Sequence, residues 1–239
     1  MAGQLLRVVG YTLVPVAAAL VGGVVAVVRP PGPRARSYVQ HFAAGVVFAA
    51  VAAEVLPDVH DRAPAVVVAG FAIGVATMLV VQRVGEELGG HGSDAAAGGV
   101  LGLLVTVAID LFIDGFLVGA AFAVGTSEGF VVTVALTLEV LFLGLSIVAA
   151  MADDAATARK LGTVAGVGLV LLAGAVVGTL FLGVVPRWGL TAVLAFGAAS
   201  LLYLVTEELL VEAHEVPQSL GGVTAFFLGF IVLFVLDML

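Results

Sequence analysis

Residues 98–124 read GGVLGLLVTVAIDLFIDGFLVGAAFAV, a long apolar run that contains two carboxylates, Asp110 and Asp114. About 20 apolar residues are enough for a helix to cross the hydrocarbon core of a bilayer. A charged side chain at that depth costs roughly 3 kcal/mol or more, and it usually faces a cavity, a partner or a bound ion. This run therefore predicts a membrane-spanning helix whose two acids have a function.

The composition of the whole chain agrees with a membrane protein. Of its 239 residues, 62% are hydrophobic and 11% are charged, whereas a soluble domain has about 25% charged residues. The acidic residues number 17 against 9 Lys and Arg, which argues against nucleic acid as a partner because phosphate binding needs basic clusters. Cysteine is absent, which excludes disulfides and thiolate metal sites.

Seven further apolar runs are long enough to span a bilayer, and short polar or Pro/Gly-rich connections separate them. We therefore expect an all-α integral membrane protein with eight transmembrane helices in a single membrane domain, 1–239. The predicted spans are 5–28, 38–57, 64–84, 98–124, 129–151, 161–184, 189–210 and 219–238.

The distribution of basic residues predicts the orientation, because cytoplasmic loops carry an excess of Lys and Arg. Six basic residues fall near one side of the predicted membrane and three near the other. Those six are Arg29, Arg34, Arg36, Arg83, Arg159 and Lys160, and the three are Arg7, Arg62 and Arg187. We therefore expect both termini outside, in a multi-pass protein of the cell membrane.

An internal repeat joins the second and seventh spans. The segments Glu54–Asp61 and Glu208–Glu215 both read acid-x-Leu-x-acid-x-His-acid, 154 residues apart. The two spans run in opposite directions, so the pattern predicts a 3+2+3 inverted repeat: 1–84 and 161–239, with central helices over 98–151. Inverted repeats recur in transporters, with the substrate site near the midplane. Chance convergence of two helix ends is the alternative.

A third carboxylate, Glu139, lies in the middle of the fifth span. Asp110 and Asp114 share one helix face and are about 6 Å apart along its axis. Glu139 lies at similar depth if helices four and five pack antiparallel. Three carboxylates this close cannot all be ionised without a counter-charge. The group therefore predicts a site that holds either a divalent cation or protons, in competition. The alternative is a structural hydrogen-bonded pair that locks helix four to a neighbour.

Ligands that are all oxygen favour harder ions such as Mn²⁺, Mg²⁺ or Ca²⁺, although Zn²⁺ and Fe²⁺ also accept carboxylates. All four histidines lie at helix ends or in loops rather than in a span centre. We expect the ion to be a substrate and no cofactor to be bound.

Acidic residues and histidines also gather at two span ends. They are either way-stations on a cation path or ordinary solvated helix ends. This peripheral set comprises Glu54, Asp58 and His60 in the first repeat, and Glu208, Glu212, His214 and Glu215 in the second.

Three local motifs resemble the ZIP family of divalent metal transporters. Phe42-Ala-Ala-Gly45-Val, followed by Glu54-Val-Leu-Pro57-Asp58, is similar to the family's second helix, and the stretch 208–215 is similar to the end of its seventh. The run from Gly221 to Asp237 is similar to its eighth. This resemblance implies eight helices, both termini outside and a zinc, manganese or iron substrate.

The resemblance also implies which residues hold the metal. Asp110, Asp114 and Glu139 fall at ligand positions of the family's fourth and fifth helices and would rebuild one metal position. Apolar residues replace the family's other ligands, so the second position is lost. They are Leu111, Val140, Leu143 and Leu169.

We therefore expect transport of a divalent cation, by alternating access or an elevator-like motion. A degenerate, non-transporting membrane scaffold or metal sensor is the second hypothesis. The chain lacks the His-Glu-x-x-His motif of a metalloprotease, and its two helix-four aspartates share one helix, so we do not expect an enzyme. Lipid and the divalent cation are the expected partners, and a homodimer is one option for the oligomeric state.

Overall fold

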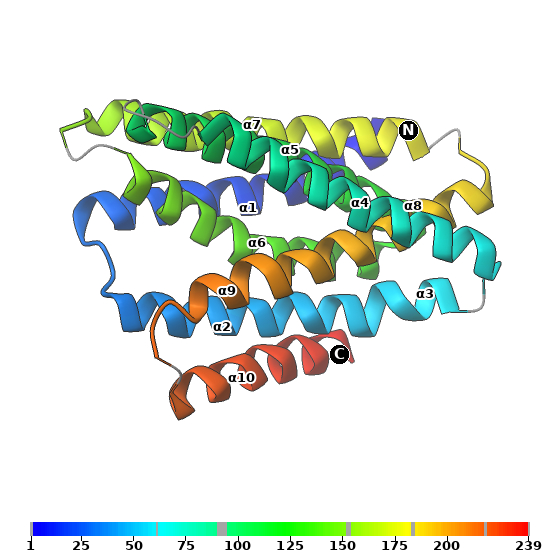
Figure 1. Ribbon diagram of the computed structural model, residues 1–239. Coiled ribbons are helices and arrows are strands. Elements are labelled where there is room, and N and C mark those ends of the chain that lie inside the picture. Colours follow the sequence, from blue (N-terminus) through cyan, green and yellow to red (C-terminus); the bar gives the residue numbers. More distant parts are fainter. Residues whose placement is uncertain are drawn as a thin grey trace.

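The structure is a computed structural model that describes residues 2–60, 62–89, 95–151, 154–182, 185–217 and 219–238. The described chain is helical, and its helices run along a common direction (Figure 1). They are α1 (Ala2–Val28), α2 (Pro33–Ala50), η1 (Val51–Val55), α3 (Leu56–His60), α4 (Pro64–Gly89), α5 (Ala95–Val124), α6 (Thr126–Ala150), α7 (Thr157–Leu182), α8 (Arg187–Tyr203), η2 (Leu204–Leu209), α9 (Leu210–Ala213) and α10 (Leu220–Asp237). Because α2–η1–α3 and α8–η2–α9 are continuous, these elements form eight helices.

Six of these helices are long and apolar enough to cross a membrane, which confirms a multi-pass membrane protein. They are α1, α4, α5, α6, α7 and the continuous α8–η2–α9. The predicted second and eighth spans do not reach that standard. In α10 the apolar stretch, Leu220–Leu236, is shorter, and the first nine residues of α2 include several polar or charged side chains, among them Arg34, Arg36, Ser37, Gln40 and His41.

Several helices begin earlier or end later than predicted. The helix α2 begins at Pro33, since proline suits the first helical position, where its missing N–H leaves no bond unmade. Arg34 and Arg36 therefore lie in the first turn of α2 rather than in a loop. Similarly, α4 continues to Gly89 and α5 begins at Ala95, so the third connection is shorter than the predicted 85–98. His91 lies outside the described residues.

The helices divide into two groups of four by their contacts. The most extensive contacts pair α5 with α7 and α1 with α6 in one group, and α2 with α10 and α4 with α8 in the other. Figure 1 shows α10 lying along α2 on the side away from α7. The two groups meet mainly where α4 contacts α5 and where α2 contacts α6. The helices that carry the three central carboxylates, α5 and α6, thus both lie at this boundary.

The helix α5 packs unusually closely on α7. A Cβ atom added at Gly115 would lie 2.0 Å from the carbonyl oxygen of Leu171, and one added at Gly174 would lie 2.2 Å from that of Phe112. Small residues allow helix backbones to approach in a membrane, where packing rather than the hydrophobic effect holds helices together. This contact fixes the turn of α5 that bears Asp114.

We expect Gly115→Ala to destabilise the protein by about 1–3 kcal/mol, the usual range for overpacking a tight site. The added methyl group meets backbone, which cannot rotate away as a side chain can. Thermal unfolding in detergent measures the effect. The control is Gly166→Ala on α7, where an added Cβ meets nothing within 4 Å. Equal melting temperatures for the two variants would contradict this view of the α5–α7 contact.

Candidate metal centre

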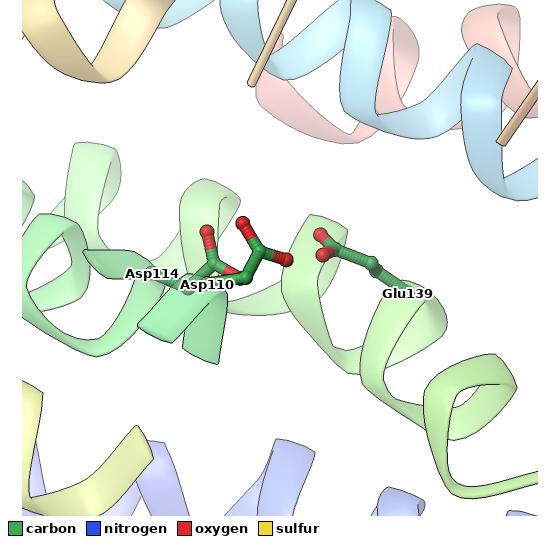
Figure 2. A group of neighbouring side chains, drawn as sticks. All are labelled: Asp110, Asp114 and Glu139. Carbon is green, nitrogen blue, oxygen red and sulfur yellow. The ribbon is translucent and has the colours of Figure 1, made fainter. Parts of the chain in front are cut away.

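The three predicted ligands come together inside the protein. Asp110 and Asp114 lie one turn apart on α5, and Glu139 faces them from α6, which follows after the single residue Gly125. The side chains are 3%, 2% and 1% exposed, respectively. Figure 2 shows their carboxylate groups pointing into the same space between the two helices. The antiparallel packing of α5 and α6 is what brings Glu139 to the depth of the two aspartates.

The spacing of the carboxylates fits a metal ion. One oxygen from each residue lies within 4.8 Å of the other two. Three atoms at that limit are each about 2.8 Å from their common centre, which is the separation divided by √3. Metal–oxygen bonds are about 2.0–2.2 Å for Zn²⁺ and about 2.3–2.6 Å for Ca²⁺. Small side-chain movements are therefore enough to close the three oxygens around a divalent ion.

Four oxygens of this group have no hydrogen-bond partner among the described residues. They are Oδ2 of Asp110, Oδ2 of Asp114 and both Oε atoms of Glu139. Buried polar atoms are nearly always hydrogen-bonded, and a buried carboxylate without a partner is among the most unfavourable groups in a protein. A divalent cation would satisfy all four oxygens and cancel the repulsion among the three residues. The donor set on these helices therefore fits a metal ion.

Apolar side chains surround the carboxylates along both helices. Leu111, Leu136 and Val140 are fully buried at 0% exposure. A low-dielectric environment strengthens the attraction between a bound cation and its ligands. Leu169, the fourth residue assigned to the lost second metal position, is 61% exposed. Because it faces away from the interior, Leu169 does not lie in the region of the carboxylates, where the resemblance led us to expect it.

In the peripheral set, Glu208 lies in η2, Glu212 lies in α9, and His214 and Glu215 follow α9 directly. Glu208 is close enough for its charge to act on Asp110, Asp114 and Glu139, and it also feels the charge of Glu212. Glu212 forms an ion pair with Arg36. At the same end, the ring of His214 packs edge-on against that of His41 with centroids 5.2 Å apart, and Glu215 lines a surface cavity.

The first-repeat members lie elsewhere. His60 ends α3 and lines a different cavity together with Arg62. The side chains of Glu54 and Asp58 lie outside the described part of the structure, so their role as way-stations stays a prediction. The structure thus brings Glu208 near the central carboxylates and does not bring His60 there.

Two π-helical segments interrupt the long helices, and the sequence did not predict them. The segment η1 (Val51–Val55) contains Glu54, and η2 (Leu204–Leu209) contains Glu207 and Glu208. Pro57 has no N–H to donate to the previous turn, which gives a local cause for the irregular helix at η1. Single π turns often occur at functional sites, and here both fall beside the acidic motifs of the repeat.

Sequence reasoning also missed the side chains of α2 that hold the end of α9. Arg36 forms an ion pair with Glu212, and the side-chain amide of Gln40 donates a hydrogen bond to the same carboxylate. Gln40 is 2% exposed and lies one helical turn after Arg36. The sequence does contain a signal for this contact. Gln40 is a polar amide at the start of an apolar stretch, four residues after the charged Arg36, and such a pair on one helix face indicates a polar partner on a neighbouring helix.

Comparison with known proteins adds no assignment. No protein-family model matches the chain, and the curated proteins contain no similar sequence. The metal centre therefore stands on its own geometry.

Proposed function

We propose that this protein moves a divalent metal cation across the membrane through the site formed by Asp110, Asp114 and Glu139. The observation that carries the proposal is the set of four buried carboxylate oxygens between α5 and α6 that have no hydrogen-bond partner within the described part of the chain. Groups of this kind persist inside a membrane protein mainly where an ion or proton passes. The proposed mechanism is ZIP-like alternating access, with an elevator-like motion as one form of it.

The pairing of helices supports the proposed inverted repeat. Exchanging α1 with α7, α2 with α8, α4 with α10 and α5 with α6 maps the four extensive pairs onto one another. The α1–α6 pair then falls on α7–α5, and the α2–α10 pair falls on α8–α4. In such an arrangement α5 and α6 lie on the pseudo-axis, where transporters of this type bind substrate.

The three carboxylates are enough ligands for a single metal position. Their chemistry is compatible with several divalent ions. Carboxylates alone suit Mn²⁺, and they also accept Zn²⁺ and Fe²⁺. The family's second metal position has no counterpart here, because buried Leu111 and Val140 stand at two of its ligands. The metal is proposed as the transported substrate rather than as a resident cofactor.

The proposed location is the cell membrane with both termini outside. The helix α1 begins and α10 ends toward the same end of the bundle (Figure 1), as an even number of spans requires. Glu208 and Glu212 would then lead from the metal site toward the cytoplasmic end. His60, Glu54 and Asp58 would lie toward the outer end.

A non-transporting scaffold or metal sensor is the second candidate, and the loss of the second metal position favours it. Such a protein would bind one regulatory ion at the same three carboxylates. Neither candidate is an enzyme, since both need only binding at the site. The two candidates differ in whether the ion crosses the membrane.

Uptake into proteoliposomes separates them. We expect the purified protein to carry radiolabelled Mn²⁺ or Zn²⁺ into liposomes, and the Asp110→Asn, Asp114→Asn double variant to fall to the level of empty liposomes. Glu86→Gln, which changes an exposed acid on α4, is the matched control. If the wild-type protein binds these ions but carries neither them nor Fe²⁺, the sensor is correct and transport is wrong.

A further inference from the structure

Arg36 connects the two groups of helices. Its Nη2 atom lies 3.5 Å from Oε2 of Glu212 and donates a hydrogen bond of 3.2 Å to Oγ of Ser146. Glu212 belongs to the same helix group as α2, whereas Ser146 lies on α6 in the other group. By contrast, the long-range side-chain hydrogen bonds of Gln4, Gln40 and Tyr203 each stay within one group.

Two further contacts hold the end of α9 against the first turns of α2. The Nε2 atom of Gln40 donates to the same Oε2 atom of Glu212 that pairs with Arg36. The hydroxyl of Ser37 donates a 2.7 Å hydrogen bond to the carbonyl oxygen of Ala213. Two successive turns of α2 therefore hold Glu212, one through the charge of Arg36 and the next through the amide of Gln40.

The contact between Arg36 and Glu212 lies at the surface, on the helix that also carries Glu208. Glu208 in η2 and Glu212 in α9 lie four residues apart, one turn along the same continuous helix. Glu212 itself lines a cavity of about 160 Å³, together with Arg36, Gln40 and Glu215. A cation that moved from the metal centre past Glu208 to this cavity would meet Glu212 on its route.

We propose that Arg36 and Glu212 form a latch that closes this end of the route and must separate when the cation passes. This inference rests on the proposed function. The guanidinium group already occupies Glu212, the carboxylate that a cation leaving Glu208 meets next, so Arg36 and the cation compete for it. Because Arg36 also donates to Ser146, a movement of Arg36 away from Glu212 can also remove one hydrogen bond between the two helix groups. The side chains are 30% and 44% exposed, and partly exposed ion pairs are weak, which allows the latch to open readily.

The absence of cysteine from the chain allows a direct test of the latch that needs no transport. A single reporter, Ala44→Cys, lies one turn beyond Gln40 on α2, at a position that is 0% exposed. The rate of labelling by a membrane-impermeant maleimide is measured in membrane vesicles of both orientations. We expect Arg36→Gln to raise the rate roughly fivefold from the face that bears Arg36, as loss of a partly exposed ion pair would do.

Three further variants make the test specific. Glu212→Gln should raise the rate by a similar factor, and Arg36→Glu combined with Glu212→Arg should restore the slow rate. Arg34→Gln removes an exposed charge from the same turn of α2 and should change nothing. Thermal unfolding shows that each variant is folded before labelling.

The outcomes are distinguishable from those of the transport assay. Unchanged labelling in both Arg36→Gln and Glu212→Gln, or an equal rise in Arg34→Gln, overturns the latch even where uptake is intact. Faster labelling that the charge-reversed pair reverses shows that Arg36 and Glu212 close this end of the protein, and a wild-type protein that then transports no ion contradicts the proposed function rather than this closure.

Discussion

Asp110→Asn or Asp114→Asn is expected to weaken the binding of Mn²⁺ by on the order of 100-fold. Removing even an outer-shell partner of a metal ligand typically lowers affinity about 10–100-fold, and these residues would be ligands themselves. Their oxygens lie within 4.8 Å of Glu139, so each substitution removes one of three charges that would hold the ion. Titration calorimetry of the purified protein in detergent measures the affinity.

The affinity is also expected to rise with pH. A carboxylate must lose its proton before it can bind a metal, so protons and the ion compete for the same oxygens. If one proton is released per ion bound, affinity increases about tenfold per pH unit over the range in which the site titrates. Affinity that stays constant between acidic and neutral pH would count against the three carboxylates as ligands. Glu86→Gln should leave both affinity and pH dependence unchanged.

The second large effect concerns Glu139 and has opposite signs with and without metal. In metal-free protein at alkaline pH, Glu139→Gln should stabilise the fold by on the order of 1–3 kcal/mol, because it removes a buried, unpartnered charge. Both Oε atoms of Glu139 lack a hydrogen-bond partner among the described residues. With Mn²⁺ at 100 times the dissociation constant, the wild-type protein gains about 2.7 kcal/mol, and the variant should lose most of this gain.

Thermal unfolding with and without Mn²⁺ checks both signs in one experiment. The alternative for this group was a structural hydrogen-bonded pair that locks α5 to a neighbouring helix. In that case Glu139 and the aspartates stabilise the metal-free fold, and neutral substitutions lower its melting temperature. A fall in melting temperature for metal-free Glu139→Gln therefore favours the structural role. Thr133, buried on the same helix and bonded to Gly129, provides a control substitution, Thr133→Val, that alters α6 without altering the charge.

The sequence was sufficient to predict the carboxylate group, and the reason is physical. Long apolar runs predicted the helices by length alone, and charges within them had to meet inside the protein because lipid does not tolerate them. Two acids at i and i+4 lie on one face of α5, and the third lies at matching depth on α6. Few packings of these two helices keep all three carboxylates out of the lipid. The structure brings Asp110, Asp114 and Glu139 together as this reasoning required.

The sequence alone could not predict which side chains pair between helices that are far apart along the chain. Arg36 and Ser146 are 110 residues apart, and nothing local to either residue indicates the other. The sequence also did not show which face of each helix packs against its neighbours. Leu169 had been assigned to a metal position, yet it is exposed because the packed face of α7 is built from Leu171, Gly174 and Ala175. Apolar residues surround a membrane helix on every side, so the sequence pattern did not mark its buried face.

Anomalous scattering from crystals soaked in Mn²⁺, and separately in Zn²⁺, tests the metal centre most directly. At neutral pH we expect a peak between α5 and α6, within bonding distance of carboxylate oxygens of Asp110, Asp114 and Glu139. The ion with the higher refined occupancy at equal concentration, after each peak is scaled by that element's anomalous scattering at the wavelength used, identifies the preference of the site. No peak beside these three residues with either ion, in crystals of the folded wild-type protein, would contradict the assignment of a metal centre.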